Sequence, residues 1–236
     1  VNSDSNNSDS FKENENYYLS SLFQFNSSLP LIKENENYQN ILKPKMAIKI
    51  SPGHTKNISK DEIRLDASNI YSLDRLSSND TLESGVSLAY GNDFKIFDKT
   101  KSRDLFSFKL ANNLRLKDNE DLPTINQLDE KTSNFFSEID YNPNNFINVK
   151  YNTSRKSNIK DTTYENLVTQ ISVNNLVTTF DYINENNTLD KNSYLLNTTK
   201  YELNDTNNVV FSTRENKTLD LTEYYNLMYQ YKNDCL

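Results

Sequence analysis

Apolar and polar residues alternate with a period of two along most of the chain. Successive side chains of a β-strand point to opposite faces, so this period is typical of strands with one apolar and one polar face. A helix would instead repeat its apolar positions about every three or four residues. The pattern therefore predicts an all-β protein. The clearest alternating segments are Phe106–Leu110, Ile147–Tyr151, Leu167–Val173, Phe180–Tyr182 and Tyr225–Tyr231.

Polar clusters separate these segments and predict the connections between strands. Asn and Asp tolerate positive φ and hydrogen-bond to nearby backbone, so they can replace glycine in tight turns. Short turns at one end and long loops at the other, in a series of about ten to twelve strands from residue 17 onward, are typical of an antiparallel up-and-down arrangement. The predicted turns are Asn142–Asn145, Asn174–Asn175 and Asn204–Asn208, and the predicted loops are Lys117–Ser133, Thr153–Thr163 and Asn184–Asn192.

The composition is consistent with a disordered chain in some respects, but its aromatic content argues against disorder. Only 35% of the residues are hydrophobic and the net charge is −7, which also suits disorder. The 15 Tyr and 12 Phe argue against it, because both are strand formers and Tyr suits a boundary between apolar and wet surroundings. We therefore expect residues 1–16 to form a flexible polar segment or loop and residues 17–236 to form part of one β-domain.

The two faces of the predicted strands discriminate between β-architectures. The apolar face is modest and aromatic, whereas the other carries Asn, Thr, Gln and Lys. A soluble sandwich needs a strongly aliphatic inner face, and no fixed repeat indicates a β-solenoid. An antiparallel up-and-down transmembrane β-barrel has this arrangement, with lipid outside and a polar interior. The chain has no run of 18 consecutive apolar residues, so we expect no transmembrane helix. Since the chain has neither an initiator Met nor a signal peptide, we expect an incomplete barrel, a fragment of a larger one.

All three glycines and the only histidine fall between residues 44 and 91. In a chain that otherwise lacks glycine, this window is where the fold requires a particular backbone shape. Gly85 and Gly91 predict a bulge or a close approach within a strand.

The chain as a whole is acidic and has no stripe of Lys and Arg, which argues against a nucleic-acid partner.

Asp74, Arg75 and Glu83 lie close together in the same window. One interpretation is an ion-pair network inside the barrel, which holds the Ser77–Thr81 turn or contacts the polar part of a cargo. The other is a solvated turn whose surface charges contribute little. An Arg on the lipid face at mid-membrane costs about 2–4 kcal/mol, so a barrel predicts that Asp74, Arg75, Glu83 and Gly85 belong to the lumen side.

Catalysis at His54 is a hypothesis that the sequence supports only weakly. Ser51 lies three residues before it, but Pro52-Gly53 makes a turn, and neither a G-x-S-x-G element nor a third positioned group is present. One His and one Cys leave only carboxylates, in no zinc or EF-hand spacing. We expect no catalytic residue, no metal and no cofactor, and hence no enzyme.

Three sequence elements resemble a known family. PKMAIKISPGHTKN at Pro44–Asn57, IYSLDRLSSNDTLESGVSLAYG at Ile70–Gly91 and VFSTRENKTLDLTEYYNLMYQYKNDCL at Val210–Leu236 resemble the C-terminal barrel of LptD, the lipopolysaccharide-assembly protein of the outer membrane. The resemblance implies insertion of lipopolysaccharide into the outer leaflet through a barrel that opens sideways between its first and last strands. It also implies two partners besides the lipid, an outer-membrane lipoprotein plug like LptE and a periplasmic bridge protein.

Cys235 is the only cysteine. A lone Cys is usually a small buried hydrophobe, but in an oxidising compartment an odd Cys suggests a partner elsewhere. The resemblance implies a disulfide with a cysteine of the N-terminal periplasmic domain, outside this chain.

Three other functions remain open from the sequence. A porin or receptor barrel would share only the architecture and would carry small solutes. A phospholipase-like barrel would need His54 for lipid hydrolysis. A secreted β-rich adhesin would be soluble without detergent.

Overall fold

The computed structural model describes residues 20–77, 81–186 and 191–232. Residues 1–16 and Cys235 lie outside these ranges. The described part forms one 12-stranded antiparallel sheet and two short 3-10 helices. The strands are β1 (Phe23–Ser28), β2 (Leu31–Glu34), β3 (Tyr38–Ser51), β4 (Gly85–Asp98), β5 (Arg103–Arg115), β6 (Phe135–Tyr141), β7 (Ile147–Arg155), β8 (Thr162–Val173), β9 (Leu176–Asn186), β10 (Lys191–Asn204), β11 (Asn207–Asn216) and β12 (Leu221–Tyr231), and the helices are η1 (Asn69–Tyr71) and η2 (Thr124–Asn126).

Each strand from β3 onward pairs with the next along the chain, which confirms the predicted up-and-down order. At the first edge, β1 and β2 both pair with β3, one after the other along its length. Pro30 lies between them and has no N–H to donate to a neighbouring strand, while the Leu29 N–H bonds to the Pro44 carbonyl at 3.1 Å. The two short strands therefore act as one edge strand that is interrupted at Pro30.

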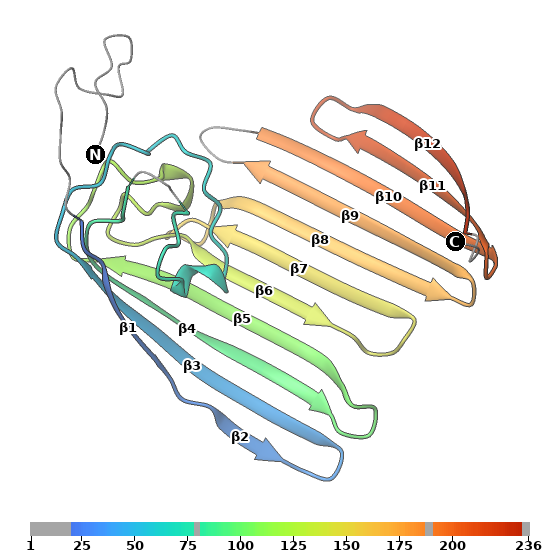
Figure 1. Cartoon of the computed structure of the whole chain (residues 1–236), viewed down its shortest axis with the longest axis horizontal. Helices are drawn as coiled ribbons and strands as arrows, with labels where there is room; N and C mark the ends of the chain where they lie inside the picture. Colours follow the sequence, from blue (N-terminus) through green and yellow to red (C-terminus); the bar gives the residue numbers. More distant parts are fainter. Residues whose placement is uncertain (1–19, 78–80, 187–190, 233–236) are drawn as a thin grey trace.

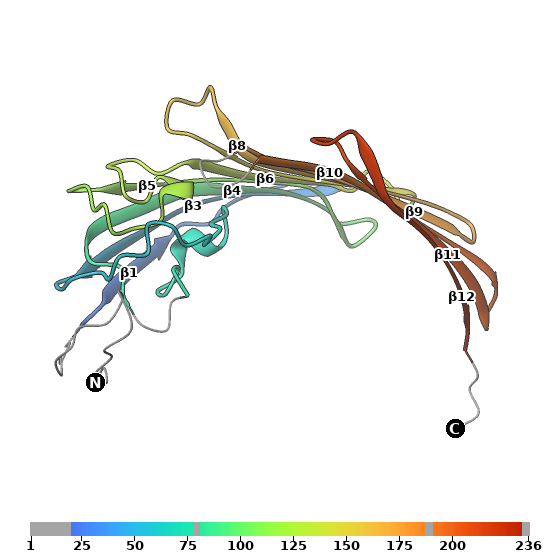
Figure 2. The same cartoon turned by 90° about the horizontal axis from the view of Figure 1, so that it is seen from above.

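The sheet is a curved wall (Figures 1 and 2). Its first and last strands lie far apart, so the sheet is open as the described residues form it. The connection between β3 and β4 folds onto the concave side of this wall (Figure 2). Residues 52–77, 81–84 and 116–134, which connect β3 to β4 and β5 to β6, are called the cap below. They lie at one end of the sheet, and the connections at the opposite end are short.

The strand register fixes which side chains face the cap. In β3, Ala47, Lys49 and Ser51 are buried beneath the cap, whereas Met46 and Ile50 are 38% and 47% exposed. Following the pairs from strand to strand places one set of alternating residues on the concave inner face and the other on the convex outer face. The outer face is largely apolar, and in β12 it carries Tyr225, Leu227, Tyr229 and Tyr231. The alternation predicted from the sequence is confirmed.

The predicted turns are confirmed, but two predicted loops are too long. Turns join β6 to β7, β8 to β9 and β10 to β11 at the three Asn-rich clusters, and Asn174 adopts a positive φ of 51°. Strand β7 continues to Arg155 and β8 begins at Thr162, while β9 continues to Asn186 and β10 begins at Lys191. The ladder hydrogen bonds of neighbouring strands hold these polar ends in extended form, which composition alone does not reveal.

The hydrophobic core lies between the cap and the inner face. The two cap segments bind each other through the Ile58 N–H and Asp121 carbonyl at 2.8 Å, and the Thr124 N–H and Ser59 carbonyl at 3.2 Å. Leu122, Leu128 and Phe136 have at most 1% of their surface exposed. The cap and the wall therefore share one packed interior. The buried apolar residues are Ala47, Ile58, Leu65, Ala67, Ile70, Leu76, Ala89, Ala111, Leu122, Leu128 and Phe136.

The helices of the described ranges are too short and polar for any of them to cross a membrane.

Candidate functional site

Arg75 and Glu83 form a bidentate ion pair within the cap. Arg75 follows η1, and Glu83 lies two residues before β4. The Arg75 Nε donates to Glu83 Oε2 at 2.7 Å and its Nη2 donates to Oε1 at 2.5 Å. Their side chains are 1% and 3% exposed. A planar guanidinium matches both carboxylate oxygens, which makes this the strongest geometry for a charged pair.

The wall supplies two further cations to the same carboxylate. Lys49 of β3 places its Nζ 3.5 Å from Glu83 Oε2 and donates to the Ser72 carbonyl at 3.1 Å. Arg115, the last residue of β5, donates from Nη1 to Glu83 Oε1 and from Nη2 to the Ser84 carbonyl. Three buried cations thus surround one buried carboxylate. We call Lys49, Arg75, Glu83 and Arg115 the ion cluster.

Arg75 also bonds directly to the wall. Its Nη1 donates to Asn113 Oδ1 of β5 at 2.9 Å, and its Nη2 donates to Ser87 Oγ of β4 at 3.2 Å. Burial alone would raise the pKa of Glu83, but the positive charge of Arg75, with Lys49 and Arg115, lowers it to about 2. Glu83 is therefore ionised at neutral pH, and the ion cluster fastens the cap to three strands.

The other two predicted site residues have different surroundings. Asp74 is exposed, and its Oδ1 accepts a hydrogen bond from the Ser77 N–H at 3.2 Å. Gly85 has a φ of +96°, and a Cβ there would lie 3.1 Å from Arg115 Nη2. Gly85 therefore turns the chain from Glu83 into β4 beside the ion cluster, at a backbone geometry that other residues rarely adopt.

Gly91 marks the close approach predicted for this window. A Cβ at Gly91 would lie 2.0 Å from the Leu110 carbonyl oxygen and 2.4 Å from Tyr71 Oη. Burial raises the pKa of Tyr71, so its hydroxyl stays neutral. Lys45 lies 4.5 Å from the centre of the Tyr71 ring and pairs with Asp93 at 2.9 Å. The cap thus touches the wall where the wall lacks a side chain.

The far side of the cap reaches strands β5 to β9. Ser68 of the cap accepts a hydrogen bond from Lys109 at 3.0 Å, and Lys109 pairs with Glu138 at 2.8 Å. Arg64 pairs with Glu185 and lies 4.1 Å from the centre of the Tyr164 ring. These contacts form a second, more exposed set of polar links between the cap and the wall, on the side away from β3.

His54 has no geometry that favours catalysis. Its side chain is 73% exposed, and its Nε2 lies 4.0 Å from Asp121 Oδ2. The nearby Ser51 hydroxyl donates to the Ser21 carbonyl at 2.8 Å. Within residues 20–77, 81–186 and 191–232, His, Cys, Asp and Glu form no group arranged to hold a metal.

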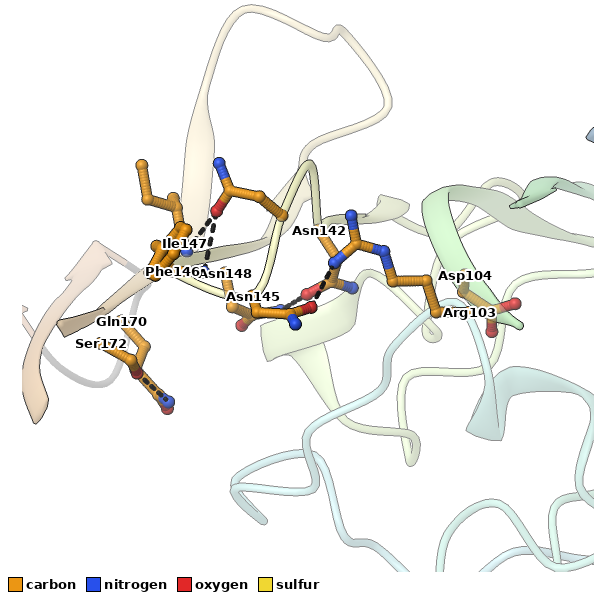
Figure 3. Close-up of a pocket in the computed structure, with 10 residues that line it drawn as sticks. Arg103, Asp104, Asn142, Asn145, Phe146, Ile147, Asn148, Gln170 and Ser172 are labelled. Carbon is orange, nitrogen blue, oxygen red and sulfur yellow. Dashed lines mark hydrogen bonds between the residues drawn. The ribbon is translucent and has the colours of Figure 1, made fainter. Parts of the chain in front are cut away.

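A polar pocket of about 420 Å³ lies at the opposite end of the wall, beside the turn from β6 to β7. Figure 3 shows this turn between Arg103 on one side and Gln170 and Ser172 on the other. The Asn-rich cluster predicts the turn itself but not the pocket. The pocket combines β5, the turn and β8, which are separated in the sequence and become neighbours only through strand pairing.

A curved up-and-down sheet with an apolar convex face and a polar concave face defines the wall of a membrane β-barrel protein. The family model described as "LptD: LPS transport system D" matches residues 1–230. The chain belongs to the LptD family, which transports and assembles lipopolysaccharide in the outer membrane, as the resemblance implied. Comparison with curated proteins gives no match.

Proposed function

We propose that this chain forms part of the wall of an outer-membrane barrel through which lipopolysaccharide reaches the outer leaflet. The polar inner face solvates the sugar portion, and the acyl chains leave sideways into the membrane between separating strands. The observation that carries this proposal is the two-sided wall, because a lipid with a large sugar headgroup needs a polar path and an adjacent apolar one. Lipid transport requires no catalytic residue.

The lengths of the connections support an orientation in the membrane. Outer-membrane barrels have short periplasmic turns and longer extracellular loops. The turns after β4, β6, β8 and β10 are short, whereas the cap connects β3 to β4 and β5 to β6 at the opposite end. In this orientation the cap closes the external end of the lumen, and cargo arrives at the short-turn end.

The ion cluster supports a cap that stays in place during transport. Lifting the cap would separate Arg75 and Glu83 from Lys49 and Arg115, whose side chains are at most 5% exposed. Breaking a buried charge pair costs about 3–5 kcal/mol because it leaves uncompensated charge. A closed external end leaves the side of the barrel as the exit, which agrees with lateral release.

The proposed partners are lipopolysaccharide, an LptE-like lipoprotein plug and the periplasmic bridge protein. Family membership supports all three. The inner face of β9 to β12, which carries residues such as Thr198, Arg214 and Asn226, supplies polar surface for a plug. The disulfide of Cys235 with a cysteine outside this chain stays a prediction.

Depletion of the full-length protein in its own cells tests the function. We expect newly made lipopolysaccharide to be lost from the cell surface. Chemical labelling of its sugar on intact cells measures this loss. Uptake of small solutes should be maintained until the envelope fails. Early loss of solute uptake with normal surface lipopolysaccharide would instead identify a porin and contradict the proposal.

A further inference from the structure

The pocket beside the β6–β7 turn has the composition of a carbohydrate site. Its volume of about 420 Å³ lies in the roughly 300–1,000 Å³ range of small-molecule sites. Side-chain amides dominate its lining, with one exposed aromatic ring and one hydroxyl group. The residues that line it are Arg103, Asp104, Asn142, Asn144, Asn145, Phe146, Ile147, Asn148, Gln170 and Ser172.

Strand pairing places the central groups of the pocket on the inner face. Asn148 is paired with Gln170, and the Ser172 N–H donates to the Phe146 carbonyl at 2.7 Å. By alternation, Ser172 shares the face of Asn148 and Gln170, and Phe146, in the turn just before β7, lines the same pocket. Phe146 is 57% exposed. The pocket therefore offers an apolar ring beside a row of amides to anything inside the wall.

The amides are held in place but keep free acceptor atoms. The Asn148 Nδ2 donates to Asp140 Oδ1 at 3.2 Å and to Asn142 Oδ1, and the Gln170 Nε2 donates to Ser172 Oγ at 3.3 Å. In the part of the chain that the structure describes, Asn148 Oδ1 and Gln170 Oε1 accept no hydrogen bond. These acceptors, with the Ser172 hydroxyl, match a ligand whose own groups both donate and accept.

The charged residues of the pocket are already engaged. Arg103 donates to Asn145 Oδ1 at 2.8 Å and to the Pro143 carbonyl at 2.7 Å, which fixes the turn. Asp104 pairs with Lys95 at 2.7 Å. An anion such as phosphate needs several N–H groups free to donate to it, whereas both terminal nitrogens of Arg103 already donate to neutral acceptors of the turn. The pocket offers mainly neutral acceptors instead, so its chemistry suits hydroxyl groups better than phosphate.

We propose that this pocket binds a neutral sugar ring, with hydroxyl groups on Asn148, Gln170 and Ser172 and an apolar sugar face on Phe146. The proposal rests on the proposed function in one respect, that the sugar portion of lipopolysaccharide travels along the inner face. It adds a defined subsite at the short-turn end, where this cargo first meets the wall.

The absence of tryptophan from the chain allows a direct binding measurement. Phe146→Trp in the full chain, refolded in micelles, places one fluorescent reporter in the pocket. We expect lactose, a neutral disaccharide, to change its emission saturably. In the same background, Asn148→Ala and, separately, Gln170→Ala should each weaken binding by about tenfold, the loss of one well-made hydrogen bond.

Asn175→Ala in the neighbouring short turn is the matched control and should leave the lactose affinity unchanged. Saturation-transfer NMR on the unsubstituted chain repeats the measurement without the reporter. No saturable response to lactose by either method would overturn the proposal. So would tighter binding of inorganic phosphate or glucose 1-phosphate, or an equal loss in the Asn175→Ala control.

The binding and transport experiments can fail separately. If the refolded protein binds lactose but depleted cells keep normal surface lipopolysaccharide, the transport function is contradicted and the sugar site stands. Lipopolysaccharide transport by a protein whose pocket binds no sugar would do the reverse.

Discussion

Glu83 is the residue on which attachment of the cap depends. It is the one carboxylate among Lys49, Arg75 and Arg115, and it links the cap to β3 and β5. Replacing the buried pair by apolar residues is often neutral in proteins, but removing one partner leaves charge without compensation. The contribution of Glu83 is therefore best measured by removing its charge alone.

We expect Glu83→Gln to destabilise the cap by about 3–5 kcal/mol, because three buried cations lose their counter-charge. Faster trypsin cleavage at the exposed Lys60 and Arg64 would report this loss, as would a lower urea midpoint in micelles. Glu130→Gln, an exposed cap position, is the control and should change stability by less than about 0.5 kcal/mol. Equal cleavage rates in the two variants would contradict the role of the ion cluster.

The pKa of Glu83 predicts how cap stability changes with pH. Its folded value of about 2 lies below its ordinary value of 4.5, so ionised Glu83 stabilises the folded cap. This contribution is fully present above about pH 4.5 and is lost as the pH falls toward 2. Protection factors of the cap amides, measured by hydrogen exchange with mass spectrometry and corrected for the pH dependence of intrinsic exchange, should fall as the pH drops through this interval. The fall should be smaller in Glu83→Gln, which has no carboxylate at this position to protonate.

Gly91→Ala should also loosen the cap, because the new Cβ would meet the Leu110 carbonyl and Tyr71 Oη well inside contact distance. We expect a loss of about 1–3 kcal/mol, the range for overpacked positions. Gly53→Ala is the control, since a Cβ there has no atom within 4 Å. Urea unfolding of the two variants in micelles measures the difference, and equal midpoints would refute the predicted clash.

Part of this residue-scale picture follows from the sequence. Arg75 and Glu83 are eight residues apart, and their pairing was one of the two interpretations of that stretch. Lys49 and Arg115 were missed because each is more than 30 residues from Glu83 along the chain. Only the register of β3, β4 and β5 brings them to one point. Asp74 was grouped with Arg75, yet its side chain turns to the Ser77 backbone.

At the scale of elements, alternation determines how each strand meets its surroundings. In β11, Phe211 lies on the outer face and Ser212 on the inner face. In the proposed barrel, Phe211 faces lipid and Ser212 faces the polar lumen. A charged side chain should therefore cost more stability at Phe211 than at Ser212.

We expect Phe211→Arg to reduce folding into lipid vesicles by about 2–4 kcal/mol, the cost of Arg on the lipid face near mid-membrane. Ser212→Arg should cost much less, since its side chain enters the polar interior. The folded fraction of the full-length protein, measured by heat-modifiable mobility on gels, compares the two variants. A greater loss for Ser212→Arg would reverse the assignment of the faces.

The sequence predicts strand centres better than strand ends. The centres of β5, β7, β8 and β12 follow from period-two alternation. The ends of β7 and β9 do not, because Thr153–Arg155 and Asn184–Asn186 are polar and resemble loop composition. Pairing with neighbouring strands satisfies their backbone groups, and this nonlocal gain outweighs local preference.

At the scale of the whole molecule, the proposed orientation places the cap over the external end of the lumen. Replacing residues 57–80 by a short Gly-Ser linker in the full-length protein removes Arg75 and much of the cap core. We expect cells that carry this variant to admit vancomycin, measured as increased susceptibility. The same linker inserted at Asn175 is the control. Unchanged susceptibility with normal amounts of folded protein would show that the cap does not seal the lumen.

The strand class, the alternating faces, the tight Asn-rich turns and the family all follow from the order of residues along the chain. These depend on neighbours along the chain or on a recognisable order of residues, both of which the sequence displays directly. The curvature of the wall, the cap on its concave side, the four-residue ion cluster and the pocket at the other end required the folded structure. Each joins segments that are distant in sequence, and their meeting depends on strand register and on burial, which no local pattern encodes.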